Sequence, residues 1–342
     1  MIEKAATEPL LNIEELHTSF FLKQGEVRAV SGVSLSIRPG EVLGLVGESG
    51  CGKSATAMSI LRLIPNPPGR IVSGKIRYRD VDLLGLSEKE MRKIRGNEIS
   101  MIFQEPMTAL NPVFTVGNQI GEVFRVHRDM NRKEAFEASV DMLKRVRIPE
   151  PAKRAREYPH QLSGGMRQRV MIAMALACEP DLLIADEPTT ALDVTVQAQI
   201  LALIDRLRTE RNCAVLLITH DLGIVAEVCH RVAVMYAGEV VEENTVEGIF
   251  GDPKHPYTQG LIRCVPRVDR PTEEALATIS GTVPSSTEEI VGCRFAPRCE
   301  FREPAFERYH PDLLPVEGRE GKVRCYLHHP LPPEASEAGD GA

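Results

Sequence analysis

The stretch GESGCGKS at residues 47–54 contains the residue types that binding a nucleotide phosphate requires. Its spacing follows the pattern G-x-x-x-x-G-K-[ST], in which glycines let backbone N–H groups turn toward phosphate oxygens. Lys53 would reach the β- and γ-phosphates, and the Ser54 hydroxyl would ligate Mg²⁺. The residues expected to line this nucleotide site are Gly47, Glu48, Ser49, Gly50, Cys51, Gly52, Lys53 and Ser54.

A second stretch, DLLIADEP at residues 181–188, ends a short apolar run with two carboxylates. Asp186 has the position expected of a carboxylate that orients Mg²⁺ from the tip of a neighbouring strand. Glu187 follows it and could polarise a water for attack on the γ-phosphate. An acidic pair at a strand end can also be merely solvated, but a buried run that delivers both carboxylates to a sheet edge favours a site. A general base for water favours hydrolysis over transfer to an acceptor hydroxyl.

A third stretch, QLSGGMRQRV at residues 161–170, predicts a helix N-terminus that can accept an anion. Ser163 is a good N-cap residue, and Gly164 and Gly165 leave the first-turn N–H groups uncovered. The chain therefore has two candidate phosphate sites. The stretch alone does not say which anion the second site takes.

The segments around these residues predict buried strands. The alternating stretch at residues 27–37 predicts an antiparallel strand that ends at the turn formed by Pro39 and Gly40. Short apolar runs of the kind that buried strands show occur at residues 41–47, 99–103, 181–186 and 213–219.

Helix signals separate these strands. Helical spacing at residues 53–64 stops at the sequence PNPPG. Two more helices are expected to begin at Ser87 and at Asn131, because Glu90 and Glu134 follow them three residues later. The interval between residues 103 and 181 is mostly helical.

This order of elements indicates an α/β core with a largely parallel sheet, and the GESGCGKS loop within it leads us to expect a P-loop NTPase core. We expect an N-terminal antiparallel β subdomain, a helical subdomain inserted at about residues 105–178, and a small C-terminal extension. Pro, Gly and charged residues become frequent from FGDPKHPYTQG onward. The ATPase domain is therefore expected at residues 1–251 and the extension at residues 252–342.

The composition excludes some classes of protein. The 342 residues are 43% hydrophobic and 26% charged, which is ordinary for a globular protein. A net charge of −7 argues against a general nucleic-acid binder. The longest apolar stretch, residues 170–177, is far shorter than the roughly 20 residues that a membrane span needs. The start, MIEKAATEPL, lacks the basic residues followed by an apolar run that a secretory signal shows, so we expect a cytosolic chain. In that compartment we expect the eight cysteines to form no disulfide framework.

Five motifs follow one another over about residues 11–250: GESGCGKS, IFQEP, LSGGMRQR, LLIADEPTTALD and LLITHD. In this order they resemble the ATP-binding subunits of ABC transporters. The resemblance implies that ATP lies between the P-loop of one subunit and the LSGG helix of another. Ser163 and Gly165 would then bind the γ-phosphate of ATP held by a partner chain, and neither half-site is complete without a dimer.

The resemblance also implies roles for single residues. Gln104 would sense Mg²⁺ and the attacking water while contacting the membrane subunits, and His220 would be the switch histidine at the γ-phosphate. Asp193 would cross the dimer interface. Either Phe20 or Phe21 would stack on adenine, and we prefer Phe20.

Together these assignments imply a catalytically competent subunit that uses ATP and Mg²⁺. The residues expected to be catalytic are Glu187, His220 and Gln104, and those expected at Mg²⁺ are Ser54, Gln104 and Asp186. The residues expected to bind ATP in trans are Ser163, Gly164, Gly165 and Asp193.

Three stretches, at residues 102–120, 158–176 and 250–262, resemble the oligopeptide/dipeptide permease branch of ABC importers. This branch takes up di- or oligopeptides, and close relatives handle nickel, glutathione or peptide-like antibiotics. The resemblance implies two membrane permease subunits, an extracytoplasmic substrate-binding protein, and a second ATPase subunit that is identical or a paralogue. It implies a peripheral protein on the cytoplasmic face of the cytoplasmic membrane, without a nucleic-acid partner.

The tail resembles the segment in which many such subunits hold a [4Fe–4S] cluster through four cysteines. Cys293, Cys299 and Cys325 match, but Phe306 stands where the fourth cysteine is expected. Three thiolates with an external ligand remain one alternative, and a tail without metal is the other. The histidines that could supply a fourth ligand are His310, His328 and His329.

Three other classes of protein fit these motifs less well. A P-loop kinase shares the phosphate loop and the Mg²⁺ carboxylate but has no need of an LSGG helix. A non-transport ABC protein of DNA repair or translation would usually carry coiled-coil insertions or two ATPase domains and a basic surface. A passive scaffold would not need the intact catalytic set.

Overall fold

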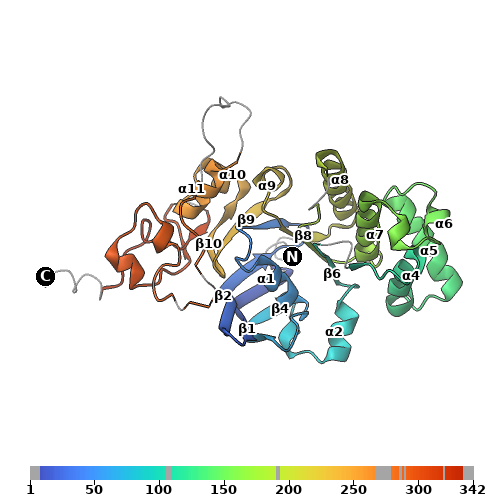
Figure 1. The fold of residues 1–342 in the computed structure, drawn as a ribbon, viewed down its shortest axis with the longest axis horizontal. Coiled ribbons are helices and arrows are strands. Elements are labelled where there is room, and N and C mark those ends of the chain that lie inside the picture. The colour runs from blue at the N-terminus through green and yellow to red at the C-terminus, as the bar shows by residue number, and fades with distance from the viewer. Residues whose placement is uncertain are drawn as a thin grey trace. The chain divides into compact units, whose positions relative to one another are not determined.

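The computed structural model describes residues 8–104, 109–189, 193–265, 279–284, 287–288, 290–318 and 320–333. The chain divides into two compact units, which are described separately. The first unit comprises residues 1–11, 37–42 and 78–218. The second comprises residues 12–36, 43–77 and 219–342. Figure 1 labels many of their helices and strands.

The first unit contains three parallel strands. They are β6 (Ile99–Ile102), β7 (Leu182–Asp186) and β8 (Ala214–Ile218), with β7 between the other two. Every residue of these strands is buried, as expected for parallel strands that are covered on both faces. The three strands predicted from apolar runs in this unit are therefore confirmed.

Helices make up most of the rest of the first unit. They are α2 (Glu88–Ile94), α4 (Val116–His127), α5 (Arg132–Arg145), α6 (Pro151–Arg154), α7 (Gly164–Leu176) and α8 (Val194–Arg211). The shorter elements are β5 (Val81–Asp82) and the 3-10 helices η2 (Leu83–Gly85) and η3 (Pro159–Gln161). Helices α4 to α7 follow β6 and precede β7, which is the interval that the sequence predicted to be mostly helical.

Two of these helices begin where the sequence predicted. Ser87 and Glu90 form a capping box at α2, and Asn131 and Glu134 form one at α5. In each box the first residue accepts a backbone N–H of the first turn, and the glutamate accepts the N–H of the cap. No helix in the described ranges is long and apolar enough to cross a membrane.

The second unit contains two groups of strands. In one group, β2 (Gly25–Ile37), β1 (Leu11–Leu22) and β4 (Gly69–Tyr78) are neighbours in that order. Only two residues connect β1 to β2, which is a connection that antiparallel strands allow. The structure thus places the strand predicted at residues 27–37 in an N-terminal hairpin.

The other group is mixed. Strand β3 (Val42–Val46) runs parallel to β9 (Arg231–Tyr236), and β10 (Glu239–Thr245) is antiparallel to β9. Two short strands of the C-terminal segment, β12 (Lys322–Val323) and β11 (Leu314–Pro315), continue this group beyond β10. The sequence did not predict β9, β10 or these two additions.

Short helices complete the second unit. They are α1 (Lys53–Ile60), α9 (Leu222–Val228), α10 (Val246–Gly251), α11 (Pro256–Arg263) and the 3-10 helices η4 (Ala296–Arg298) and η5 (Pro304–Glu307). The prediction of a helix through residue 64 was wrong at its end. Arg62 adopts a left-handed conformation with φ 51°, and the N–H of Leu63 donates to the carbonyl of Met58, so the chain closes the helix after Ile60.

Candidate nucleotide-binding and hydrolysis site

The phosphate loop lies between a strand and a helix, as its sequence pattern requires. Strand β3 ends at Val46 and α1 begins at Lys53. Gly47 and Gly52 have φ values of 149° and 104°, which favour glycine. A Cβ at Gly47 would lie 2.1 Å from the carbonyl oxygen of Met235, and one at Gly52 would lie 2.2 Å from that of Ala29. The backbone path of the loop therefore excludes any larger residue at both positions.

The N-terminus of α1 is open to an anion. Its N-cap residue is Gly52, and no side chain caps the first turn. The first N–H groups of a helix have no partner within the helix, and the helix dipole adds positive potential at this end. Lys53 and Ser54 are the first two residues of the helix, so their backbone N–H groups belong to this open end.

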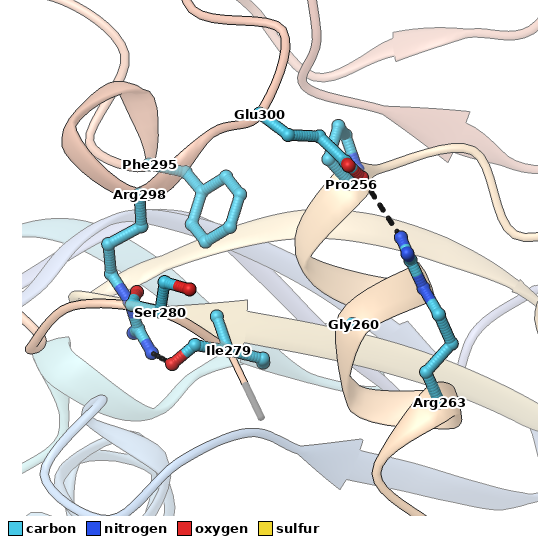
Figure 2. A pocket seen from close by; sticks show the side chains of 8 residues that line it. All are labelled: Pro256, Gly260, Arg263, Ile279, Ser280, Phe295, Arg298 and Glu300. Atoms are coloured by element: carbon cyan, nitrogen blue, oxygen red, sulfur yellow. Dashed lines mark hydrogen bonds and ion pairs between the residues drawn. The ribbon is translucent and has the colours of Figure 1, made fainter. Parts of the chain in front are cut away.

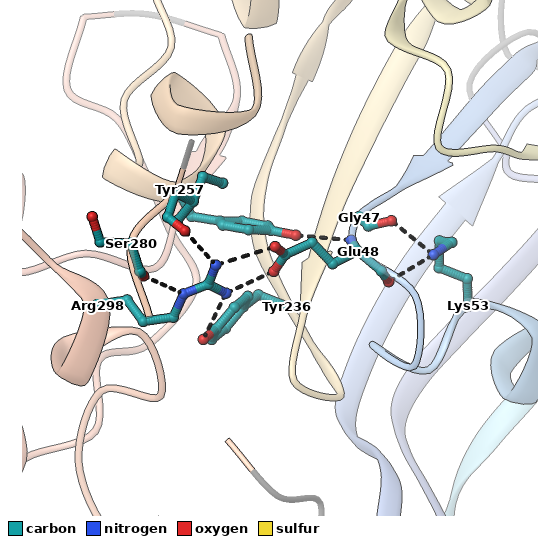
Figure 3. A network of polar contacts seen from close by, with 8 residues as sticks. Gly47, Glu48, Lys53, Tyr236, Tyr257, Ser280 and Arg298 are labelled. Atoms are coloured by element: carbon teal, nitrogen blue, oxygen red, sulfur yellow. Dashed lines mark hydrogen bonds and ion pairs between the residues drawn. The ribbon is translucent and has the colours of Figure 1, made fainter. Parts of the chain in front are cut away.

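Lys53 lies over the loop. Its side chain is buried, and Nζ donates to the carbonyl oxygens of Gly47 at 2.8 Å and Glu48 at 2.9 Å (Figure 3). Nζ also lies 3.6 Å from Sγ of Cys51. Burial raises the pKa of the Cys51 thiol, while the charge of Lys53 lowers it by less, so the thiol stays neutral. Phosphate oxygens could replace the two carbonyls as partners of Lys53 Nζ.

In the first unit, Gln104 and Glu187 come together from positions 83 residues apart in sequence. The side-chain amide of Gln104 donates to Oε2 of Glu187 at 2.9 Å. Glu187 has φ 46°, and its backbone N–H donates to the carbonyl of Ile218 at 2.9 Å, so its backbone is held directly after β7. Asp186, the last residue of β7, is 3% exposed. One carboxylate is thus buried at the strand end and the next is oriented by an amide.

Gln168 is a site residue that the sequence analysis did not single out. It lies on α7, is buried, and donates from Nε2 to the carbonyl of Pro188, the residue after Glu187. This hydrogen bond joins the helix that follows Ser163 to the segment that carries the carboxylates. A signal for it existed, because Gln168 shares one helix face with Ile172 and Ala175, both buried, and a polar residue on such a face needs a partner.

Ser163 is the N-cap of α7, as predicted. Its Oγ accepts the backbone N–H of Met166 at 3.3 Å. Ser163 and Gly164 are exposed, and a Cβ at Gly164 would meet no atom within 4 Å. Asp193 similarly caps α8, where its carboxylate accepts the N–H of Val196 at 2.9 Å. The start of α7 is therefore an exposed helix terminus that a ligand could approach.

His220 and Phe20 belong to the second unit. His220 is exposed, and the next residue, Asp221, caps α9. Phe20 is half-buried beside Gly69, where a Cβ would lie 2.9 Å from the phenylalanine ring, whereas Phe21 is 51% exposed. Consecutive residues of a strand point to opposite faces, so these two rings cannot stack on the same partner.

The candidate residues thus fall into two sets. The first unit holds Gln104, Ser163, Gly164, Gly165, Asp186, Glu187 and Asp193. The second unit holds Phe20, the loop residues from Gly47 to Ser54, and His220.

The cysteine-bearing tail does not fit a four-cysteine iron–sulfur site. Phe306 is buried and its ring stacks on that of Tyr326 at 5.5 Å, in the place of the fourth thiol. Burial raises the pKa of the Cys293, Cys299 and Cys325 thiols.

The three histidines considered as replacement ligands are engaged elsewhere. Nε2 of His310 lies 2.9 Å from both carboxylate oxygens of Glu239. Nε2 of His328 and His329 lies within hydrogen-bonding distance of the carbonyls of Lys254 and Val323. Among the residues that the structure describes, no group of three or more His, Cys, Asp and Glu side chains is arranged to hold a metal ion.

Comparisons with known proteins identify the family of the chain. A family model described as ABC transporter matches residues 30–190, and one described as oligopeptide/dipeptide transporter, C-terminal region, matches residues 241–305. The chain is 54% identical to a probable peptide ABC transporter ATP-binding protein of Sinorhizobium fredii, over 85% of this chain and 87% of that protein. It is 50% identical to the dipeptide transport ATP-binding protein of Bacillus subtilis, over 97% and 99% of the two chains.

The fold is similar to solved ATP-binding cassettes. One is a dimeric structure in a post-hydrolysis state bound to ADP and phosphate. It superimposes with a TM-score of 0.62 and 28% identity, over 69% of this chain and 98% of that chain.

Proposed function

The chain belongs to the ABC transporter family of ATP-binding proteins and is an ATP hydrolase, and we propose roles in that activity for the candidate residues of each unit. Family membership implies membrane permease subunits and a pair of ATPase subunits. The loop from Gly47 to Ser54 would hold the phosphates of ATP, and Phe20 would stack on adenine. His220 would contact the γ-phosphate.

The hydrogen bond between Gln104 and Glu187 carries the proposal of hydrolysis. It orients one carboxylate oxygen at 2.9 Å from the amide and leaves the group aligned to take a proton from water. Asp186 and the Ser54 hydroxyl would each offer an oxygen ligand of the kind that Mg²⁺ prefers, and Mg²⁺ would neutralise charge that develops on the phosphates. Nζ of Lys53 would exchange the loop carbonyls that it now contacts for oxygens of the β- and γ-phosphates.

The substitution Glu187→Gln tests this role. The amide keeps the shape of the side chain but cannot accept a proton, so ATP should still bind while steady-state hydrolysis falls by about 100-fold or more. Glu137→Gln is the matched control, because Glu137 is an exposed glutamate on α5. Hydrolysis at the normal rate by Glu187→Gln would exclude Glu187 as the base. Transfer of phosphate to an acceptor without release of free phosphate would favour the kinase alternative.

We further propose that the exposed start of α7 binds ATP held by the other ATPase subunit. Ser163, Gly164 and Gly165 would approach the γ-phosphate, and Asp193 would lie at the subunit interface. The mass of the Glu187→Gln protein with ATP distinguishes the alternatives. A dimer of this chain alone supports an identical partner, and a dimer that forms only with a related chain supports a paralogue. A protein that stays monomeric with ATP and either partner would contradict the proposal.

We propose di- or oligopeptides as the cargo, delivered by an extracytoplasmic binding protein, with this subunit on the cytoplasmic face of the membrane. The support is the C-terminal match and the names of the relatives. The family model for that region begins at residue 241, close to the division that we propose between residues 251 and 252. Uptake assays with labelled dipeptides, nickel, glutathione and a peptide antibiotic, in cells with and without this chain, would identify the cargo.

We propose that the tail folds without an iron–sulfur cluster, because Phe306 fills the fourth position and, among the described residues, no group of His, Cys, Asp and Glu side chains is arranged to hold a metal ion. Protein purified without oxygen should contain no iron in proportion to protein and no visible absorbance of a cluster. Stoichiometric iron would overturn this proposal without affecting the proposed ATP site.

A further inference from the structure

Glu48, in the phosphate loop, is attached to the C-terminal segment through both its backbone and its side chain (Figure 3). Its N–H donates to the hydroxyl of Tyr257 at 2.9 Å. Its carboxylate accepts two hydrogen bonds from Arg298, at 2.7 Å from Nη1 and 3.1 Å from Nη2. Its carbonyl is one of the two that hold Lys53. A single loop residue therefore links the lysine of the loop to residues more than two hundred positions away.

Arg298 is held in one orientation. Its side chain is 3% exposed. Besides Glu48, its guanidinium donates to the carbonyls of Ser280 at 2.9 Å and Ile279 at 3.3 Å, and to the hydroxyl of Tyr236 at 3.5 Å. These acceptors occupy every N–H of the guanidinium, which leaves it little freedom to rotate. Because the pair between Arg298 and Glu48 is bidentate, it fixes the orientation of the Glu48 carboxylate as well as neutralising its charge.

Tyr257 is equally constrained. It is fully buried at the start of α11, and its ring packs against those of Tyr236 at 4.7 Å and Phe295 at 5.5 Å. Its backbone N–H donates to Nδ1 of His255 at 3.0 Å. Burial raises the pKa of Tyr257, so the hydroxyl stays neutral and can accept the N–H of Glu48. The aromatic cluster thus presents a fixed acceptor to the phosphate loop.

We propose that Arg298 and Tyr257 are positioning residues of the nucleotide site, through which the C-terminal segment sets the shape of the phosphate loop and hence its affinity for ATP. This proposal rests on the proposed assignment of the loop to ATP. A phosphate is bound by several loop N–H groups at once, so a small displacement of the loop weakens all of them. Movement of the C-terminal segment would therefore change the affinity of the phosphate loop for ATP.

A matched control lies in the same part of the molecule. Arg298 forms one wall of a cavity of about 140 Å³, and Arg263 of α11 forms another. Figure 2 shows Arg263 paired with Glu300, at 3.0 Å. Both members of this pair are about half exposed, and neither is bonded to the phosphate loop. Arg263→Met removes the same charge from the same cavity without touching Glu48.

The test is the binding of a non-hydrolysable ATP analogue to the full chain, measured by calorimetry for both Kd and stoichiometry. We expect Arg298→Met and Glu48→Gln each to raise Kd about tenfold with full stoichiometry. The double variant should be no weaker than the worse single variant, because both changes break one interaction. Arg298→Lys keeps the charge but cannot donate two parallel hydrogen bonds, so its Kd should lie between those of the wild type and Arg298→Met. Tyr257→Phe should raise Kd about threefold.

The outcomes separate positioning from simple stability. A purely structural role would lower the thermal midpoint and the fraction of protein that binds, while the Kd of the folded fraction stayed unchanged, and this would overturn the proposal. So would a normal Kd in Arg298→Met, additive effects in the double variant, or an equal effect of Arg263→Met. If Arg298→Met unfolds, Glu48→Gln and Arg298→Lys supply the same comparison. Lys53→Ala should abolish binding in every case, and normal binding by that variant would instead refute the proposed ATP site.

Discussion

The substitution Gln168→Leu tests whether the buried link between α7 and the carboxylate segment supports catalysis. Gln168 is 2% exposed, and its amide donates to the carbonyl of Pro188, which is also buried. Leucine has a similar volume but no donor, so the change leaves that carbonyl without this partner. Glu187 precedes Pro188, and any movement of the carbonyl moves the proposed base.

The magnitude follows from the burial of both groups. A buried carbonyl that loses its hydrogen bond costs about 1–3 kcal/mol. Leucine recovers roughly 1 kcal/mol through its additional apolar surface. The free energy of unfolding should therefore fall by about 1 kcal/mol, and by no more than about 2 kcal/mol. A loss of about 1 kcal/mol in the transition state would lower kcat about fivefold.

Thermal unfolding and steady-state ATP hydrolysis measure the two effects. Gln199→Leu is the control, because Gln199 is an exposed glutamine whose side-chain oxygen accepts from Arg169 at 2.9 Å. We expect a lower unfolding midpoint and a lower kcat for Gln168→Leu and wild-type values for the control. If both variants behave like the wild type, the hydrogen bond between α7 and Pro188 contributes nothing and the reasoning fails.

Two further predictions concern the second unit. Burial lowers the pKa of His255 to about 3 in the folded protein. In the unfolded chain the same imidazole takes up a proton near pH 6.5. The stability contributed by the neutral ring is therefore complete above pH 6.5 and declines as pH falls toward 3. His255→Asn keeps an acceptor for the cap of α11 but removes the titrating group. In urea unfolding, the free energy of unfolding of this variant should fall by about 2 kcal/mol less between pH 7 and pH 5 than that of the wild type. An identical fall in both proteins would exclude His255 as the cause. Gly52→Ala places a Cβ 2.2 Å from the Ala29 carbonyl at a left-handed φ and should abolish ATP binding. Gly85→Ala, where a Cβ meets no atom within 4 Å, should bind normally, and retained binding by Gly52→Ala would show that the loop can adopt another path.

Local signals account for what the sequence predicted well. Capping residues such as Ser87 and Asn131 act on N–H groups within three residues, and buried strands such as β7 show as continuous apolar runs. The helix through residue 64 was extended too far because its apolar spacing continues while the backbone already turns at Arg62. The spacing of apolar residues does not indicate a turn that forms at a residue other than glycine.

The sequence by itself determined the chemistry: a loop whose pattern places glycines at Gly47 and Gly52, a lysine after it, and two carboxylates after a buried strand. These are short-range requirements, so adjacent residues reveal them. Only the tertiary structure decided the partners. Gln104 meets Glu187 across 83 residues, and Arg298 meets Glu48 across 250, because the folding of distant segments, which no local pattern encodes, brings them within hydrogen-bonding distance.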